Sequence, residues 1–141
     1  YNRFLQQESS TERPLRVSPE DYRNNLRSMI KIARENSITP ILITAPSTHR
    51  IGHEPAYLQG RFLNNIQQLI PLHNQYTDIV RDVAKQDGVL LLDLQKQMDA
   101  IPYTALRDKY MKGDGIHWQP AGGTAVAESL YQLIQENHLL D

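Results

Sequence analysis

Two residues near the end of the chain, Asp114 and His117, suggest a definite chemistry. They lie three positions apart in the glycine-rich stretch GDGIHWQPAGG, which spans 113–123. A carboxylate at this spacing can hold one ring nitrogen of the histidine, so that the other nitrogen is free to accept a proton. Such a pair supplies two members of an acyl-transfer triad and lacks only a nucleophile. The alternative interpretation is a surface Asp–His pair that caps the last helix.

A second group of polar side chains lies in the long loop after the first apolar run of the sequence. His49, His53 and Glu54 are residue types that bind zinc. No predicted helix fixes their geometry, so the sequence favours substrate contact by His49 or Arg50 over a metal site. Metal-dependent phosphoester hydrolysis by His49, His53 and Asp114 is the alternative chemistry, and it would be lost on chelation.

Four other side chains have structural interpretations beside functional ones. His73 and Tyr76 fall on a predicted helix and are expected to pack against it or cap it. Trp118 either lines an acyl pocket or forms a buried wedge beside the last helix. Asp93 follows an apolar run and is interpreted either as structural or as a support for the site.

The strands that must position these residues are predicted at 38–45 and 89–94, two short and largely apolar runs. Because neither run alternates with polar residues, both strands are expected to be buried on both faces of a parallel sheet. The segment 46–69 is predicted to be a long irregular connection with some helix after position 61. The segment 96–112 is predicted to be a short helix and a loop.

Three amphipathic segments are predicted to be the main helices. The first has Ser18 as N-cap and Pro19 as its first residue, and it ends at Asn36 and Ser37. Its apolar face is predicted to comprise Tyr22, Leu26, Met29, Ile30 and Ala33. The second helix spans 71–86 and is stopped by Gly88. The last helix begins at Pro120.

This order of helices and strands predicts a parallel sheet that is covered by helices on both faces. Ligands bind at the carboxyl ends of the strands in such sheets, and both the first loop and the Asp–His stretch follow a predicted strand. They are therefore expected to meet at one edge. Gly113 and Gly115 are expected to allow sharp turns there, and Gly122 and Gly123 to let the last helix pack close to the sheet.

Composition narrows the class of protein. The chain has 141 residues, which suits one domain, and its formal net charge is -1. No basic stripe indicates nucleic-acid binding, and no apolar run is long enough to span a membrane. Cysteine is absent, which excludes disulfides and a cysteine nucleophile. The sequence predicts a soluble protein and leaves its compartment open, with the cell envelope or secretion among the alternatives.

Two strands do not form a stable sheet of this kind, because parallel sheets need several strands and two covered faces. The chain also begins at Tyr1, within a polar segment. The sequence is therefore interpreted as the later part of a longer polypeptide. The remaining strands are expected from an upstream segment or from a partner chain.

Several segments resemble the SGNH (GDSL-type) esterases and lipases. The stretch Asp-Gly-Ile-His followed by Trp-Gln-Pro-Ala-Gly is similar to the final conserved block of that family. The segments 17–26, 41–46, 74–84 and 92–94 also resemble it, in the same order. The closest likeness is to the branch with isoamyl-acetate-hydrolysing esterases. The resemblance covers nearly the whole chain but only the second half of the family's fold.

The resemblance implies a three-layer α/β/α, flavodoxin-like fold, with residues 1–141 as the carboxyl-terminal part of a single domain. It implies that His117 is the general base and Asp114 its orienting partner. The family's nucleophilic serine belongs to a Gly-Asp-Ser block after the first strand, and no such block occurs here. Asn2 is the candidate oxyanion donor, although Arg3 stands where the family has aspartate. The alternative is that Asn2 is merely a terminal residue.

The function implied is serine-dependent ester hydrolysis, of the lipase, esterase or carbohydrate-deacetylase type, on a small-molecule or glycan ester. No metal or organic cofactor is implied. Transfer of the acyl group to another acceptor would use the same residues. A different alternative is a non-catalytic module of the same fold, kept for binding or scaffolding. The segment is expected to be inactive until an upstream segment or partner chain completes it.

Overall fold

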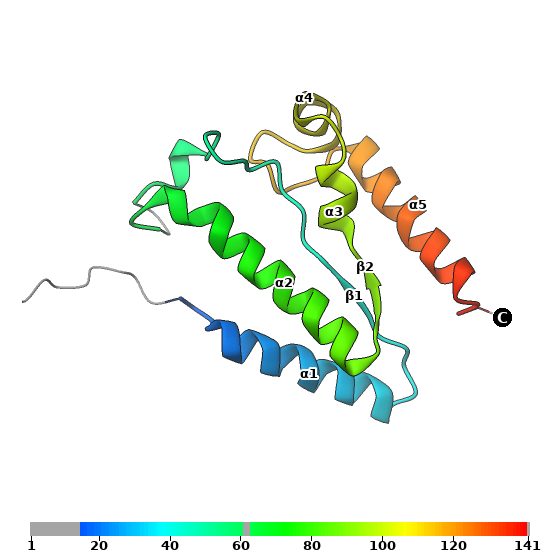
Figure 1. Cartoon of the computed structure of the whole chain (residues 1–141). Helices are drawn as coiled ribbons and strands as arrows, with labels where there is room; N and C mark the ends of the chain where they lie inside the picture. The colour runs from blue at the N-terminus through cyan, green and yellow to red at the C-terminus, as the bar shows by residue number, and fades with distance from the viewer. Residues whose placement is uncertain (1–14, 61–62, 141) are drawn as a thin grey trace, which may run out of the picture.

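The computed structural model describes residues 15–60 and 63–140, and Asn2 lies outside the described residues. Two short parallel strands lie between three longer helices (Figure 1). The longer elements are α1 (Pro19–Glu35), β1 (Ile41–Ile43), α2 (Leu69–Asp87), β2 (Leu90–Leu92), α3 (Leu94–Asp99) and α5 (Pro120–Glu136). The short helical turns are η1 (Ala56–Leu58), η2 (Ile66–Gln68), α4 (Tyr103–Ala105) and the π-helical η3 (Leu106–Tyr110).

The strands pair in parallel, with Ile41 opposite Leu90 and Ile43 opposite Leu92. Helices α1 and α2 lie on one side of this pair and α5 lies on the other (Figure 1). The side chains of β2 alternate accordingly, since Leu91 packs on the cluster of α1 and α2 and Leu92 belongs to the cluster next to α5. The expected three-layer α/β/α arrangement is confirmed.

Helix α1 begins as its sequence predicts. Ser18 accepts a hydrogen bond from the backbone N–H of Asp21, and Pro19 occupies the first turn. Leu26 and Ile30 are buried against α2, but Met29 is 57% exposed, so its predicted place on the apolar face is wrong. The buried positions recur every four residues in a narrow stripe, because α1 packs mainly on α2.

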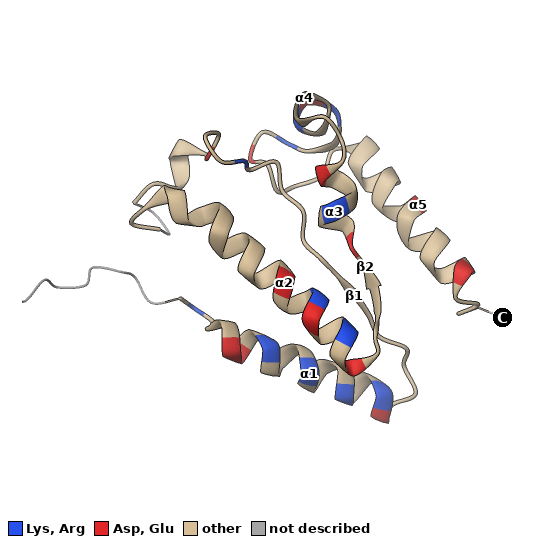
Figure 2. Ribbon diagram, viewed as in Figure 1, with Lys and Arg blue, Asp and Glu red and all other residues tan. Residues whose placement is uncertain are grey.

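The rim of the contact between α1 and α2 is charged. Figure 2 marks basic residues along α1 and both acidic and basic residues on the neighbouring part of α2. Arg23 pairs with Asp82 at 3.2 Å and Arg27 with Asp87 at 3.3 Å. These exposed pairs contribute little stability, so the buried aliphatic residues hold the two helices together.

Among the described residues, no helix has the length and hydrophobicity needed to cross a membrane.

Both strands are shorter than predicted. Each has three paired residues, although the hydrogen bond from the Thr44 N–H to the Leu92 carbonyl, at 3.2 Å, continues the contact. Ile38 and Ile43 are 60% and 41% exposed, so the prediction that this whole run is buried is wrong. In the part of the chain that the structure describes, β1 pairs only with β2, and this single pairing does not cover the run completely.

The segment before the Asp–His stretch forms a second core that the sequence did not predict. Leu106 of η3 and Met111 are fully buried, and they contact aliphatic residues of α5. Trp118 packs against the same cluster, as in the wedge interpretation. The antiparallel bridge between Met111 and Trp118 closes a loop whose tip carries Asp114. The packing of η3 against α5 therefore fixes both ends of that loop.

Gly122 allows this packing. A Cβ at Gly122 would lie 2.1 Å from the Tyr110 carbonyl oxygen and 2.6 Å from the Trp118 ring. The first turn of α5 thus contacts the segment 110–118 closely rather than the sheet, which corrects the expected reason for the glycines. Among the described residues, no atom lies within 4 Å of a Cβ at Gly123.

The two glycines give a matched pair of variants. We expect Gly122→Ala to lower the free energy of unfolding by about 2 kcal/mol, because the backbone at Tyr110 must move to accept a methyl group. Gly123→Ala should instead raise it by about 0.5 kcal/mol, because alanine favours an exposed helical position. Urea unfolding of both variants checks the prediction, and equal effects would contradict the contact at Gly122.

Candidate active site

Asp114 and His117 lie at the tip of the loop that the Met111–Trp118 bridge closes. The Lys112 N–H donates to the His117 carbonyl at 2.7 Å, and the Gly115 N–H donates to the Lys112 carbonyl at 2.8 Å. Gly115 adopts φ +77°, a left-handed conformation that glycine takes without strain. This tight turn brings the two side chains together.

The carboxylate of Asp114 is satisfied on both oxygens. Its Oδ1 accepts the backbone N–H groups of Ile116 and His117, each at 3.0 Å, and its Oδ2 lies 2.7 Å from His117 Nδ1. The His117 N–H, the Ile116 N–H and then the His117 ring hold the pKa of Asp114 well below its ordinary value. Asp114 is therefore ionised at neutral pH and can only accept hydrogen bonds.

This arrangement fixes the tautomer of His117. Because Asp114 Oδ2 is an acceptor, Nδ1 carries the proton of the neutral ring, and Nε2 keeps its lone pair. The side chain of His117 is 68% exposed and that of Asp114 is 36% exposed. The pair thus presents an oriented base on an open surface of the described residues, which is the arrangement that proton transfer requires.

The loop after β1 reaches the same place, as the sequence predicts. The Thr48 N–H donates to the Gly115 carbonyl at 2.9 Å. His49 Nε2 and the Tyr57 hydroxyl each lie 3.1 Å from the Asp114 carbonyl oxygen. A Cβ at Gly115 would lie only 2.4 Å from Thr48 Oγ1, so this glycine also permits the close approach of the two loops. Neither Thr48 nor Tyr57 was predicted to belong to the site.

Arg50, the other predicted substrate-loop residue, binds its own loop. Its guanidinium donates to the carbonyls of Ser47 and His49 at 2.9 Å and to Asp99 Oδ1 of α3 at 2.7 Å.

His53, one of the residues of the alternative metal site, stacks on Tyr103 with ring centroids 5.3 Å apart. Within residues 15–60 and 63–140, no group of three or more His, Asp or Glu residues could hold a metal ion.

A polar network under the strand ends gives Asp93 the supporting role that its position suggested, and its other members, Arg81 and Thr44, were not predicted. Arg81 of α2 binds both oxygens of Asp93, at 2.8 and 2.9 Å, and Thr44 donates to Asp93 Oδ1 at 2.9 Å. The Arg81 hydrogen bonds lower the pKa of Asp93 to about 2. Asp93 also caps α3 by accepting from the Lys96 N–H. The network ties both strands to α2 and so supports the loops that follow them.

His73 has the packing role that was expected of it. It is partly buried on α2, and this burial lowers the pKa of its imidazole despite a hydrogen bond with the Ala45 backbone. The lowered pKa favours the neutral form of His73. Its ring contacts the backbone at Ala45, where β1 leads into the loop that carries His49. The hydroxyl of Tyr76 donates to the Val17 carbonyl before α1, which is a structural contact.

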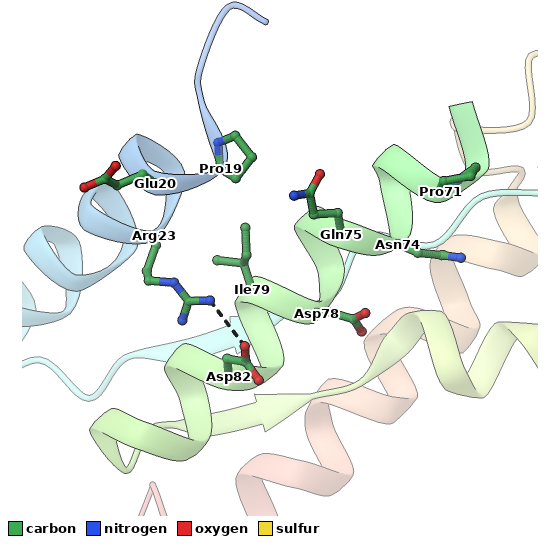
Figure 3. Close-up of a pocket in the computed structure, with 9 residues that line it drawn as sticks. All are labelled: Pro19, Glu20, Arg23, Pro71, Asn74, Gln75, Asp78, Ile79 and Asp82. Carbon is green, nitrogen blue, oxygen red and sulfur yellow. Dashed lines mark hydrogen bonds and ion pairs between the residues drawn. The ribbon is translucent and has the colours of Figure 1, made fainter. Parts of the chain in front are cut away.

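A groove of about 520 Å³ lies between α1 and α2. The residues that line it fall between positions 19 and 82 of the chain, well before Asp114 and His117. Figure 3 shows Arg23 reaching Asp82 across it, with Glu20 and Asp78 at its sides. Of the predicted site residues that the structure describes, none lines this groove. Within the groove Arg23 pairs with Asp82, whereas Asp78 pairs with Arg81. The candidate site stays with Asp114 and His117.

The chain is similar in sequence to a bacterial lipoprotein and in structure to several solved proteins. No family model matches the chain. The uncharacterized lipoprotein YqeF of Bacillus subtilis is 29% identical over an alignment that covers 92% of this chain and 56% of the relative. The chain thus spans little more than half the length of this relative.

Several of the similar solved structures are named lipases or esterases. A lipase/acylhydrolase from Enterococcus faecalis matches 87% of this chain and 54% of its own, with a TM-score of 0.63 and 19% identity. A GDSL-like lipase from Bacteroides thetaiotaomicron matches 85% and 54%, with a TM-score of 0.62 and 20% identity. An acetylxylan esterase from Geobacillus stearothermophilus matches 83% and 47%, with a TM-score of 0.54 and 17% identity.

At these identities the likeness is one of fold. The matched region covers about half of each solved chain. In this chain the parallel strand pair lies between helical layers (Figure 1). The described part of this chain therefore has the α/β/α fold of the GDSL-type lipases, of which it spans one portion.

Proposed function

We propose that this chain is the carboxyl-terminal part of a serine-dependent ester hydrolase of the SGNH type, and that it supplies the base and the acid of the triad. The observation that carries the proposal is the 2.7 Å contact between His117 Nδ1 and an Asp114 carboxylate that two backbone N–H groups hold in place. The fold, shared with lipases and esterases, supports the same proposal. The nucleophile would come from an upstream segment or a partner chain.

In this reaction His117 Nε2 takes the proton of the serine hydroxyl while the serine oxygen attacks the ester carbonyl. Collapse of the tetrahedral intermediate breaks the ester bond, and the imidazolium returns its proton to the leaving alcohol. His117 then activates water, which releases the acid and regenerates the serine. Asp114 stabilises the imidazolium at each stage. Asn2 is proposed as one donor to the oxyanion.

We propose a small acyl group, such as acetyl, on an alcohol or a sugar as the substrate class. One solved structure of the same fold is named an acetylxylan esterase, which supports a carbohydrate ester. The likeness to isoamyl-acetate-hydrolysing esterases remains a prediction from the sequence, as does acyl transfer by the same residues. The name of the Bacillus subtilis relative, a lipoprotein, supports a place in the cell envelope.

The experiment is fluorophosphonate labelling of the full-length protein, with the modified residue mapped by mass spectrometry. We expect one labelled serine in a Gly-Asp-Ser block upstream of this sequence, together with hydrolysis of p-nitrophenyl acetate. The chain 1–141 alone, which contains Ser47 but no such block, is the matched control and should stay unlabelled. A full-length protein that neither labels nor hydrolyses the ester would be a non-catalytic module.

A further inference from the structure

The backbone carbonyl of Asp114 receives two side-chain donors from the loop after β1. His49 Nε2 and the Tyr57 hydroxyl both lie 3.1 Å from that oxygen. A carbonyl oxygen only accepts hydrogen bonds, so His49 must carry a proton on Nε2. The loop therefore holds the main chain of Asp114, and it leaves the carboxylate free to hold His117.

The contact between the two loops continues at the next residue. The Thr48 N–H donates to the Gly115 carbonyl at 2.9 Å, beside the place where the His49 ring approaches Gly115. A Cβ at Gly115 would lie 2.8 Å from His49 Nε2, a distance that real Cβ contacts avoid. Glycine at 115 thus lets the imidazole lie directly against the turn.

His49 is itself held by neighbouring groups. The backbone N–H of His49 donates to Ser47 Oγ at 3.3 Å, and its backbone carbonyl accepts from Arg50. The Arg50 guanidinium also binds Asp99 of α3 at 2.7 Å. Ser47 and Thr48 are each only 6% exposed. A side chain on such a braced loop can act as a fixed support for a neighbouring turn.

We infer that His49 is a positioning residue, which orients the Asp114–His117 pair through the Asp114 backbone and does not contact the substrate. The kinetic consequence rests on the proposed ester hydrolysis. Displacement of a catalytic group by about 1 Å can reduce the rate by up to about 10²-fold. Removal of one of the two donors at this carbonyl should have a smaller effect, and it should act on kcat rather than on KM.

The test compares four variants of the full-length protein on p-nitrophenyl acetate. His49→Ala should lower kcat about tenfold and leave KM within about twofold. His49→Gln should stay within about threefold of wild type, because the glutamine Nε2 is the same number of bonds from Cβ as the histidine Nε2 and also donates. Tyr57→Phe should lower kcat about threefold. His53→Ala, on the same loop but stacked on Tyr103, should change neither constant.

A rise in KM at constant kcat for His49→Ala would show substrate contact and overturn the inference. Equal losses in His49→Ala and His49→Gln would also overturn it, since the donor would then be irrelevant. If His49→Ala does not fold, Tyr57→Phe decides, because it removes one hydroxyl from a half-exposed side chain. An unchanged kcat in Tyr57→Phe would then count against the inference.

A second readout does not depend on hydrolysis. The proton on His117 Nδ1 should give a downfield NMR resonance in wild type and His49→Gln, and it should be lost or shifted in His49→Ala. If wild type has no esterase activity but the resonance responds in this way, the proposed function fails and the positioning role stands. If the resonance does not change in His49→Ala, the positioning role fails even when the enzyme is active.

Discussion

Replacement of His117 by alanine in the full-length protein is expected to lower kcat/KM for p-nitrophenyl acetate by about 10⁴-fold, the upper end of the 10²- to 10⁴-fold that a general base contributes. The fold should persist in this variant. The ring of His117 is 68% exposed, and its backbone carbonyl, which accepts from Lys112, remains in place. An unchanged thermal unfolding temperature would therefore separate loss of the base from loss of structure.

A second histidine serves as the control for this measurement. His138 follows α5, whose 17 residues place it roughly 25 Å along the helix from Pro120. His138→Gln should leave kcat/KM within about twofold of wild type, since it changes neither Asp114 nor His117. Equal activities in His117→Ala and His138→Gln would exclude His117 as the base.

The Asp–His contact, the start of α1 and the end of α2 were predictable because their causes are local, whereas α2 begins at Leu69, two residues before the predicted start. Asp114 and His117 are joined across a turn of four residues, and Gly115 supplies the left-handed conformation that the turn needs. Ser18 begins α1 and Gly88 ends α2, each through a hydrogen bond with a residue three or four positions away in the sequence. The alternation of helices and strands also limits the topology, which explains why the layer arrangement was confirmed.

The contacts that brace the site were not predictable, because they join residues far apart in the chain. His49 and Asp114 are 65 positions apart, and Thr44 and Asp93 are 49 apart. Which loop residue meets which turn residue depends on the register of β1 against β2, and an apolar run does not specify that register. The sequence located His49 at the correct edge and assigned it to substrate, whereas the structure places it against the backbone of the proposed acid.

The exchange of Asp114 for asparagine tests the other half of the pair, and it should lower kcat by about 10³- to 10⁴-fold. An asparagine Oδ1 can still accept the backbone N–H groups of Ile116 and His117, so the turn should keep its shape. Its NH₂ group would face His117 Nδ1 and, as a donor, would require that nitrogen to be unprotonated. The proton would move to Nε2, and the base would have no lone pair for the serine.

This variant also separates catalysis from helix capping. If Asp114 only caps the surface turn, Asp114→Asn should keep full activity, because the capping oxygen Oδ1 is retained. Asp108→Asn is the matched control, since Asp108 lies on the adjoining η3 turn and pairs with the exposed Arg107 side chain. Loss of kcat in Asp114→Asn but not in Asp108→Asn, with normal unfolding of both, would assign the effect to the histidine tautomer.

The pH profile of the wild-type enzyme gives a further check. Its acid limb should show no step from Asp114, because the depressed pKa of this residue keeps the carboxylate ionised as the pH falls from 8 to about 5.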